Sequence, residues 1–312
     1  MHQTTNTILM IRPINFRMNE ETAVNNYYQK QGENTLPEAI KTKAVQEFDA
    51  LVEKLKNVGV QVIVVPDTDQ HDTPDAVFPN NWVSFHENGT VGLYPMFAEN
   101  RRLERREEVL LEIEKQGFVI TNIIDYTEAE EEGVFLEGTG SLVLDRINRK
   151  AYCALSPRAD EDLLIEFCED FEYMPVIFTA NQTVSGTRRP IYHTNVMMAI
   201  GETFTVVCLN SIDDKKERKN LIKHLTEDGK DIINITEAQV SHFAGNMLQV
   251  IGANNTRFLV MSELAYKTLT PQQLQQLEKH TQILYSNLST IETCGGGSAR
   301  CMMAEVFLPK SK

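Results

Sequence analysis

The sequence lacks the features that define several large classes of protein. No window comes near the roughly eighteen continuous apolar residues that a membrane-spanning helix needs. Residues 1–7 carry no basic stretch followed by a long apolar core, which a secretion signal would have. The five cysteines form no C-x-x-C pair and have no accompanying histidine pattern of a zinc site. We therefore expect a cytoplasmic protein with reduced thiols, no membrane partner and no structural metal.

Positive charge is also scarce. The chain has 30 Lys and Arg residues against 44 Asp and Glu residues, which gives a formal net charge of -14. Because nucleic-acid binding needs basic surface to neutralise phosphates, this balance argues against a nucleic-acid partner. A chain of 312 residues without a linker, low-complexity tract or composition break indicates one domain, residues 1–312, and leaves self-association into a homo-oligomer open.

The chain does contain clear helix and strand patterns near its start. A first strand within residues 8–14 is broken by Pro13, which cannot donate a ladder hydrogen bond. The polar segment 15–34 has the composition of a lid or surface loop. Apolar residues at helical spacing from Pro37 to Gly59 predict a helix, and the β-branched run 60–65 predicts the strand after it.

The same order of elements returns further along the chain. Pairs of short strands are each followed by a helix and a closing strand. Repetition at roughly fifty to sixty residues is typical of radial or solenoid arrays. The predicted strand pairs are 141–144 with 151–155, 196–200 with 203–209 and 247–251 with 258–261; the helices are 103–115, 160–170, 213–225 and 271–279; the closing strands are 118–124, 174–178, 232–235 and 282–285.

A run of three glycines followed by a cysteine is the most distinctive stretch. Glycines 295–297 let the backbone approach a ligand closely, and Cys301 comes just before an apolar segment that ends near Phe307. Arg300 beside it would favour the thiolate, the form that attacks carbon. Free cysteines are more often buried small hydrophobes, so Cys301 alone is a weak signal. Cys294, on the other side of the glycines, is a weaker candidate for the nucleophile.

Other polar residues stand at the ends of predicted strands. Each has an ordinary structural explanation when it is taken alone: a turn, a satisfied core histidine or a solvated arginine. Taken together they match one chemistry, because a cysteine nucleophile needs a histidine for protons, an orienting carboxylate, and arginines for a substrate carboxylate. These residues are Asp75, Asn80, Asn81, Arg101, Glu137, Arg158, His193 and Asn195.

The ordered set of motifs resembles the pentein superfamily of guanidine-modifying enzymes. That superfamily includes dimethylarginine dimethylaminohydrolase, arginine deiminase, and related citrulline hydrolases and amidinotransferases. The resemblance spans nearly the whole chain, and it implies a five-bladed α/β propeller of ββαβ units around a central polar pocket. The motifs are Pro-Asp-x-Val-Phe at 74–78, Asn-Arg-Arg at 100–102, Glu-Gly-x-Gly at 137–140, Leu-Ser-x-Arg at 155–158, His193 and the late Cys301.

The resemblance also implies roles for these residues. Cys301 would be the nucleophile, His193 the general acid and base, and Glu137 the carboxylate that orients the histidine and holds a substrate nitrogen. Asp75, Arg101 and Arg158 match the positions that grip the amino-acid end of the substrate in the dimethylarginine enzymes. No metal or organic cofactor is implied.

Departures from the family pattern point to the substrate. Asn80 and Asn81 stand where the related enzymes carry an acidic residue, and Asn195 stands where arginine deiminase has the aspartate of His-x-Asp. A buried guanidinium needs carboxylates, whereas the neutral ureido group of citrulline is complemented by amides. We therefore expect hydrolysis of citrulline to ornithine, carbon dioxide and ammonia.

Two alternatives remain at the level of the sequence. One is an amidinotransferase, a dimethylarginine hydrolase or an arginine deiminase, in which the cysteine adduct forms on a guanidino carbon. The other is a ribosome-associated, non-enzymatic member of the superfamily. The combination of Cys301, His193 and Glu137 and the acidic balance of the chain argue against the second.

Overall fold

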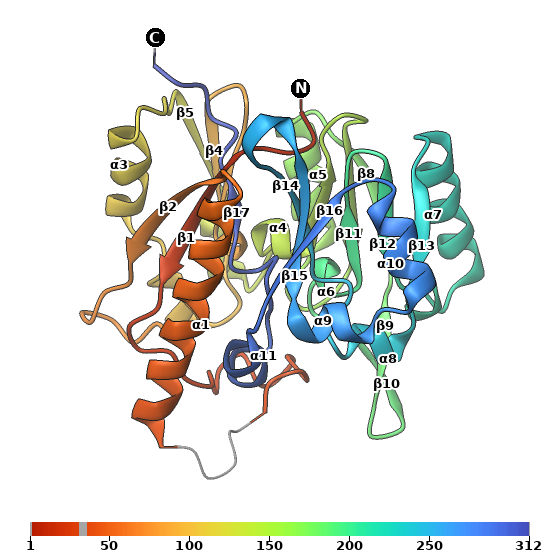
Figure 1. Ribbon diagram of the computed structural model, residues 1–312, viewed down its shortest axis with the longest axis horizontal. Coiled ribbons are helices and arrows are strands. Elements are labelled where there is room, and N and C mark those ends of the chain that lie inside the picture. The colour runs from red at the N-terminus through yellow and green to blue at the C-terminus, as the bar shows by residue number, and fades with distance from the viewer. Residues whose placement is uncertain (1, 31–35, 312) are drawn as a thin grey trace.

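The computed structural model describes residues 2–30 and 36–311 (Figure 1). In these residues, five three-stranded sheets share one connectivity. The first strand of each sheet is antiparallel to the second, the second is parallel to the third, and helical segments join the second to the third. The predicted α/β fold of repeated ββαβ units is therefore confirmed.

The bounds of the elements follow the units. Unit 1 comprises β17 (Ala304–Glu305), β1 (Thr7–Arg12), α1 (Pro37–Asn57) and β2 (Gln61–Pro66). Unit 2 comprises β3 (Val83–Phe85), β4 (Thr90–Leu93), α2 (Glu99–Arg102), α3 (Glu107–Lys115) and β5 (Asn122–Asp125). Unit 3 comprises β6 (Leu142–Asp145), β7 (Lys150–Ala154), α5 (Glu161–Asp170) and β8 (Met174–Phe178).

The remaining units have the same composition. Unit 4 comprises β11 (Met198–Ile200), β12 (Phe204–Val207), α7 (Lys215–Glu227) and β13 (Asp231–Asn234). Unit 5 comprises β14 (Leu248–Ile251), β15 (Arg257–Ser262), α9 (Glu263–Thr268), α10 (Pro271–Glu278) and β16 (Gln282–Ser286). Short connecting helices are α4 (Gly138–Ser141), α6 (Thr194–Met197), α8 (Glu237–Val240), α11 (Ser289–Gly295), η1 (Pro79–Asn81), η2 (Thr127–Glu132), η3 (Leu209–Ser211) and η4 (Ala253–Asn255).

Unit 1 joins the two ends of the chain. β17 pairs with β1 so that Glu305 lies opposite Ile8, and the C-terminal strand thereby completes the N-terminal sheet. The first strands of the units contact one another, β17 with β3, β6 with β11 and β11 with β14, as the propeller arrangement expects. In Figure 1, α3 and α7 lie at opposite edges of the molecule, with the short helices α4 and α6 between them.

Helix α1 shows how local pattern and packing agree. It begins with proline at its first turn, where no backbone hydrogen bond is lost, and Gly59 with φ of +90° follows its end. Its buried residues recur at helical spacing and pack against β2 and β16. They are Ala44, Phe48, Leu51, Val52 and Leu55.

Several boundaries differ from the sequence prediction. The helix predicted at 103–115 begins only at Glu107, as α3, and the separate short helix α2 ends before it at Arg102. The strand predicted at 118–124 begins only at Asn122. The projecting hairpin of β9 (Asn181–Val184) and β10 (Thr187–Pro190) was not predicted, nor were α4, α6, α8 and α11. Helices of four to seven residues are too short to show a helical period in the sequence.

The segment predicted as a lid has no helix or strand in its described part, residues 15–30, while 31–34 lie outside the described residues. In Figure 1 it runs beside α11. This contact is a backbone hydrogen bond from Lys30 N to Thr293 O of 2.7 Å. None of the helices in the described part of the chain is both long and apolar enough to cross a bilayer.

Candidate active site

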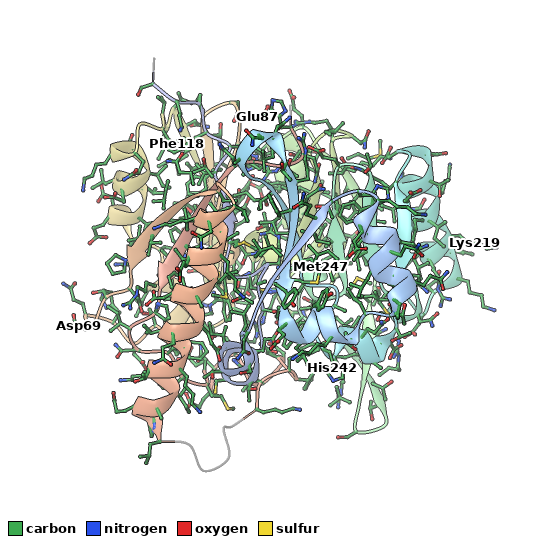
Figure 2. All side chains as sticks on the ribbon, in the orientation of Figure 1. Asp69, Glu87, Phe118, Lys219, His242 and Met247 are labelled. Carbon is green, nitrogen blue, oxygen red and sulfur yellow. The ribbon has the colours of Figure 1, made fainter. Side chains whose placement is uncertain are left out.

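Each of the five units places a buried polar side chain in the turn just before its first strand. Met247, which directly precedes β14, lies near the middle of the molecule in Figure 2. Asn81, His193 and Cys301 line one cavity, Glu137 contacts His193, and Asn246 contacts Cys301, so the five turns converge on one region. Their polar residues are Asn81, Glu137, His193 with Asn195, Asn246 and Cys301, each at most 3% exposed.

Glycines allow these turns to approach one another. Gly138 has φ of +44°, and a Cβ atom there would lie 2.8 Å from the backbone oxygen of Asn81. A Cβ on Gly140 would lie 2.8 Å from His193 Nδ1 and would also collide with the Asn81 amide. The Glu-Gly-x-Gly motif thus supplies the close contact between units 2, 3 and 4 that any larger residue would prevent.

Glu137 and His193 form a buried pair. The distance between Glu137 Oε2 and His193 Nε2 is 2.7 Å, and Phe97 N donates to Glu137 Oε1 at 3.0 Å. Burial lowers the pKa of His193 to about 4, although Glu137 opposes the shift. Burial also disfavours ionised Glu137, but Arg158, His193 and Arg101 hold the pKa of this carboxyl well below its usual range. At neutral pH the carboxylate is therefore ionised and the imidazole neutral.

These protonation states fix the tautomer of the histidine. An ionised carboxylate can only accept, so His193 Nε2 carries the proton and donates it to Glu137. His193 Nδ1 is then an unprotonated nitrogen with a free lone pair, and His193 lines the same cavity as Cys301. This arrangement can take up and return a proton beside a thiol.

Cys301 contacts amide groups. Asn246 Nδ2 lies 3.2 Å from Cys301 Sγ, and Asn195 Nδ2 lies 3.6 Å from it. The guanidinium of Arg300 is engaged elsewhere, with Met303 O and Glu305 Oε2 both at 2.8 Å. The predicted flanking cation is therefore paired with a carboxylate, and the nearest polar partners of the sulfur are neutral.

Cys294, the weaker candidate, differs from Cys301. Cys294 lies in α11, and burial raises the pKa of its thiol. It does not line the cavity to which Cys301 contributes. Its surroundings therefore favour a packing role.

Arg101 braces the turn that carries Asn81. Its Nε and Nη2 donate to the two carboxylate oxygens of Glu104, each at 2.9 Å. Its Nη1 donates to Asn81 Oδ1 at 2.9 Å, and its Nη2 also reaches Phe78 O at 3.2 Å. Most of the guanidinium is thus engaged within unit 2.

Arg158 and Asp75 are covered by the predicted lid segment. Arg158 Nε donates to Asn25 Oδ1 at 2.9 Å, and its Nη2 donates to Thr22 O at 3.0 Å. Asp75 Oδ2 accepts from Asn19 Nδ2 at 2.9 Å and from Thr22 Oγ1 at 3.1 Å. Asp75 Oδ1 has no partner among the described residues, and burial raises the pKa of this carboxyl. The lid segment therefore supplies hydrogen-bond partners to both of these buried charged groups.

The cavity between these residues is small. Its volume is about 10 Å³, roughly one water molecule, so an amino acid can enter only if the lid segment moves. Of the predicted site residues, Asn80, Glu137 and Asn195 do not line it, and Asn80 instead accepts a hydrogen bond from Asn81. Residues that do line it are Asn26, Asp75, Phe78, Asn81, Arg101, Arg158, Tyr192, His193, Gly295, Gly297 and Cys301.

Sequence reasoning missed several members of this site. Asn246 lay in a turn with no motif of its own, although its place before the first strand of unit 5 repeats that of the other four. Glu104 and Asn25 contact the arginines, and their partners could not be read from local sequence. Tyr192 Oη donates to Gly296 O at 2.6 Å and holds the glycine loop.

Comparison with known proteins identifies the family. A model of the family described as N,N dimethylarginine dimethylhydrolase, eukaryotic, matches residues 12–308. The chain belongs to this family. Membership of the dimethylarginine hydrolase family makes the chain a hydrolase of the guanidino-modifying class, which acts on non-peptide carbon–nitrogen bonds, and confirms the resemblance to the pentein superfamily. A search of curated protein sequences found no match.

Solved structures share the fold of this chain. The arginine dihydrolase ArgZ of the cyanobacterial ornithine–ammonia cycle is 17% identical over 98% of this chain and 41% of that chain, with a TM-score of 0.74. The N-terminal domain of ArgZ bound to product is 17% identical over 97% and 99%, with a TM-score of 0.73. A cysteine-to-serine mutant of DDAH from Pseudomonas aeruginosa in complex with citrulline is 14% identical over 97% and 99%, with a TM-score of 0.64. The chain thus spans about two fifths of full-length ArgZ.

Proposed function

We propose that this chain hydrolyses the ureido group of citrulline to give ornithine, carbon dioxide and ammonia. Cys301 is the nucleophile, His193 the proton carrier and Glu137 its orienting carboxylate. Asp75 and Arg158 bind the amino-acid end of the substrate once the lid segment has moved. Support for Cys301 and His193 comes from their positions on one cavity and from the 2.7 Å contact between His193 and Glu137.

The choice of a neutral substrate rests on the groups around the sulfur. Cys301 Sγ is contacted by the amides of Asn195 and Asn246, and a third amide, Asn81, lines the cavity. Glu137, the nearby carboxylate, is covered by His193 and two arginines and does not reach the cavity. Asp75 also lines the cavity, but the proposal assigns it to the amino-acid end of the substrate. A guanidinium beside the sulfur would then lack a carboxylate of its own, at a cost of several kcal/mol, which corresponds to about a thousandfold in preference.

The reaction would proceed in two halves. The Cys301 thiol passes its proton to His193 Nδ1, and the thiolate forms a C–S bond with the ureido carbon. Protonated His193 then gives this proton to the departing nitrogen, the C–N bond breaks, and a thioester-like adduct remains on the cysteine. Neutral His193 next takes a proton from water, whose oxygen attacks the adduct carbon. The C–S bond breaks, and protonated His193 returns the proton to the sulfur. The carbamic acid that is released then breaks its remaining C–N bond to give carbon dioxide and the second nitrogen product.

One observation favours a second candidate, hydrolysis of a methylated arginine: the family that matches is named for dimethylarginine. In that reaction the same thiolate would attack a guanidino carbon, and the cationic substrate would have to pair with Asp75 Oδ1, the cavity carboxylate oxygen without a partner. An amidinotransferase would differ only in the second half, where an amine replaces water.

A substrate panel separates these activities. Purified protein is incubated with citrulline, arginine, agmatine or dimethylarginine, with and without an added amine acceptor, and ornithine, citrulline and ammonia are measured. We expect ornithine and ammonia from citrulline, with kcat/KM on the order of a thousandfold above that for arginine. Citrulline formed from dimethylarginine, with no ornithine from citrulline, would overturn the proposal in favour of the second candidate.

A charge swap provides the matched test of specificity. In Asn195→Asp a carboxylate replaces the amide near the sulfur, so turnover of citrulline should fall and turnover of arginine should rise relative to it. Asn254→Asp is the control, because Asn254 lies in the exposed turn η4 between β14 and β15 and receives the same change of charge. Equal effects of the two substitutions on the arginine-to-citrulline ratio would remove the support for a neutral site.

A further inference from the structure

We propose that Asn246 is a catalytic residue whose side-chain amide donates a hydrogen bond to the Cys301 thiolate and so sets the population of the nucleophile. This inference rests on the proposed function of Cys301. Asn246 is the polar residue that unit 5 contributes to the site, as Asn81, Glu137 and His193 are contributed by units 2 to 4. It is fully buried, and Asn246 Nδ2 lies 3.2 Å from Cys301 Sγ.

The orientation of the amide follows from its other contacts. Asn246 Oδ1 lies 2.9 Å from the backbone N of Arg300, which can only donate. The oxygen of the amide is therefore the atom facing Arg300, and the NH₂ group faces the sulfur. Asn246 Nδ2 also lies 3.0 Å from Asn195 O and 3.4 Å from Asn195 Oδ1, so one hydrogen faces Asn195 and the other faces the sulfur.

The backbone around Asn246 is held in place from unit 4. Phe243 has φ of +60°, and Asn246 N donates to Phe243 O at 2.9 Å, which closes the turn. A Cβ on Gly245 would lie 2.8 Å from Met197 Cα, so this turn packs directly against α6. The donor thus reaches the sulfur from a rigid support, as a preorganised catalytic group must.

The neutral amide of Asn246 stabilises mainly one protonation state of Cys301, the thiolate. Hydrogen bonds to a charged acceptor are about twice as strong as those between neutral groups, and a thiol sulfur accepts only weakly. The amide therefore stabilises the thiolate over the thiol while Asn246 keeps both of its hydrogens. The thiol proton passes to His193 and later to the leaving nitrogen. When the sulfur bonds to carbon it loses its negative charge, and the stabilisation by the Asn246 amide is lost with it.

Two substitutions separate this role from a structural one. Asn246→Asp keeps an oxygen for Arg300 N but places a second, anionic oxygen against the sulfur. Asn246→Ala removes both contacts. If Asn246 only held the backbone of Arg300, the aspartate variant would behave like the native protein and the alanine variant would not.

The measurement is the pH dependence of alkylation of Cys301 by iodoacetamide, without substrate. Trypsin cleaves after Arg300 and Lys310, so mass spectrometry quantifies the peptide 301–310 separately from the peptide that contains Cys294. We expect the midpoint of alkylation to rise by about one to two pH units in Asn246→Asp and by about one unit in Asn246→Ala. At a pH below the midpoint, each unit of rise corresponds to roughly tenfold less thiolate. Asn254→Asp should leave the midpoint unchanged.

Unshifted midpoints in both folded variants would overturn the inference. If both variants fail to fold, NMR of the native protein decides: the side-chain amide protons of Asn246 must shift with the same midpoint as thiol alkylation, and their failure to do so would also overturn it. Because neither readout uses a substrate, a protein that ignores citrulline but shows the shifts would refute the proposed substrate and leave the role of Asn246 intact.

Discussion

Two groups of buried charges lie at opposite ends of β6 and differ in how completely they are paired. The site cluster, before β6, contains Glu137, His193, Arg158 and Asp75. Asp75 Oδ1 has no partner among the described residues, and His193 Nδ1 makes no hydrogen bond among them. Buried atoms without a hydrogen-bond partner are costly unless a ligand or water bonds to them.

The far cluster, after β6, is saturated. Lys230 Nζ reaches Asp145 Oδ2 at 3.0 Å, Gly201 O at 3.1 Å and Glu202 O at 3.0 Å, so all three of its hydrogens are used. Lys150 Nζ lies 2.7 Å from both oxygens of Asp228. The comparison teaches that burial of charge alone does not mark a site. In the described part of the chain, Lys230 has no hydrogen left for a ligand, whereas Asp75 Oδ1 is still free to accept one.

Removal of the nucleophile should give the largest effect. Cys301→Ala is expected to lower kcat by on the order of a millionfold, to background, while substrate binding and the melting temperature change little. Cys294→Ala is the control and should retain activity, because Cys294 does not line the cavity. Substantial turnover by Cys301→Ala in steady-state assays would end the assignment of Cys301 as the nucleophile beside the site cluster.

Glu137→Gln should rank second, with a loss in kcat of about 10²- to 10⁴-fold. Glu137 opposes the lowering of the His193 pKa, so without its charge the pKa of His193, about 4 in the native protein, should fall further. The imidazole accepts a proton only when it is neutral, so native activity should decline as the pH falls toward 4. In the variant this acidic limb should move to lower pH. A pH–rate profile with an unmoved limb would separate Glu137 from His193.

Lys230→Met tests the far cluster. It leaves Asp145 as an uncompensated buried charge and should destabilise the protein by about 3–5 kcal/mol in urea unfolding, with kcat unchanged in the folded fraction. Lys223→Met is the matched control, because Lys223 and Glu227 form an exposed pair. Loss of kcat without loss of stability would mean that the two clusters do not differ as described.

Glu292→Gln should give the smallest effect. Glu292 is intermediate between the two clusters, because one of its carboxylate oxygens is paired within the residues that the structure describes and the other is not. Its Oε1 accepts from Ser298 Oγ at 2.6 Å, its Oε2 has no partner among the described residues, and burial raises its pKa to about 7 from an ordinary 4.5. The folded state then binds more protons than the unfolded one, so stability is full below pH 4.5 and is lost as the pH rises through 7, by at most about 3 kcal/mol. Unfolding curves of the glutamine variant should lack this decline, whereas Glu227→Gln should keep it.

Much of the fold was visible in the sequence, because apolar periodicity is a local property. The pattern of α1 and the strand pairs of units 3 to 5 were predicted nearly to their bounds. Short motifs also identified five candidate site residues that line one cavity: Asp75, Asn81, Arg158, His193 and Cys301. That residues 1–312 form one domain stays a prediction.

The missing parts depend on contacts between units. The apolar segment that follows Cys301 contributes only the short strand β17, because only Ala304 and Glu305 pair with β1. Asn246 gained a role only through the approach of unit 5 to Cys301. The lid contact of Asn25 with Arg158 joins residues 133 positions apart, which no local pattern encodes.

The amino-acid sequence alone determined which segments become strands and helices, and which side chains can perform proton transfer and nucleophilic attack. Tertiary structure decided which of these groups meet and which remain unpaired, because the turns of five units come together only when their sheets pack. It also decided that the sulfur lies among amides, since side chains from units 1, 4 and 5 contribute to that contact.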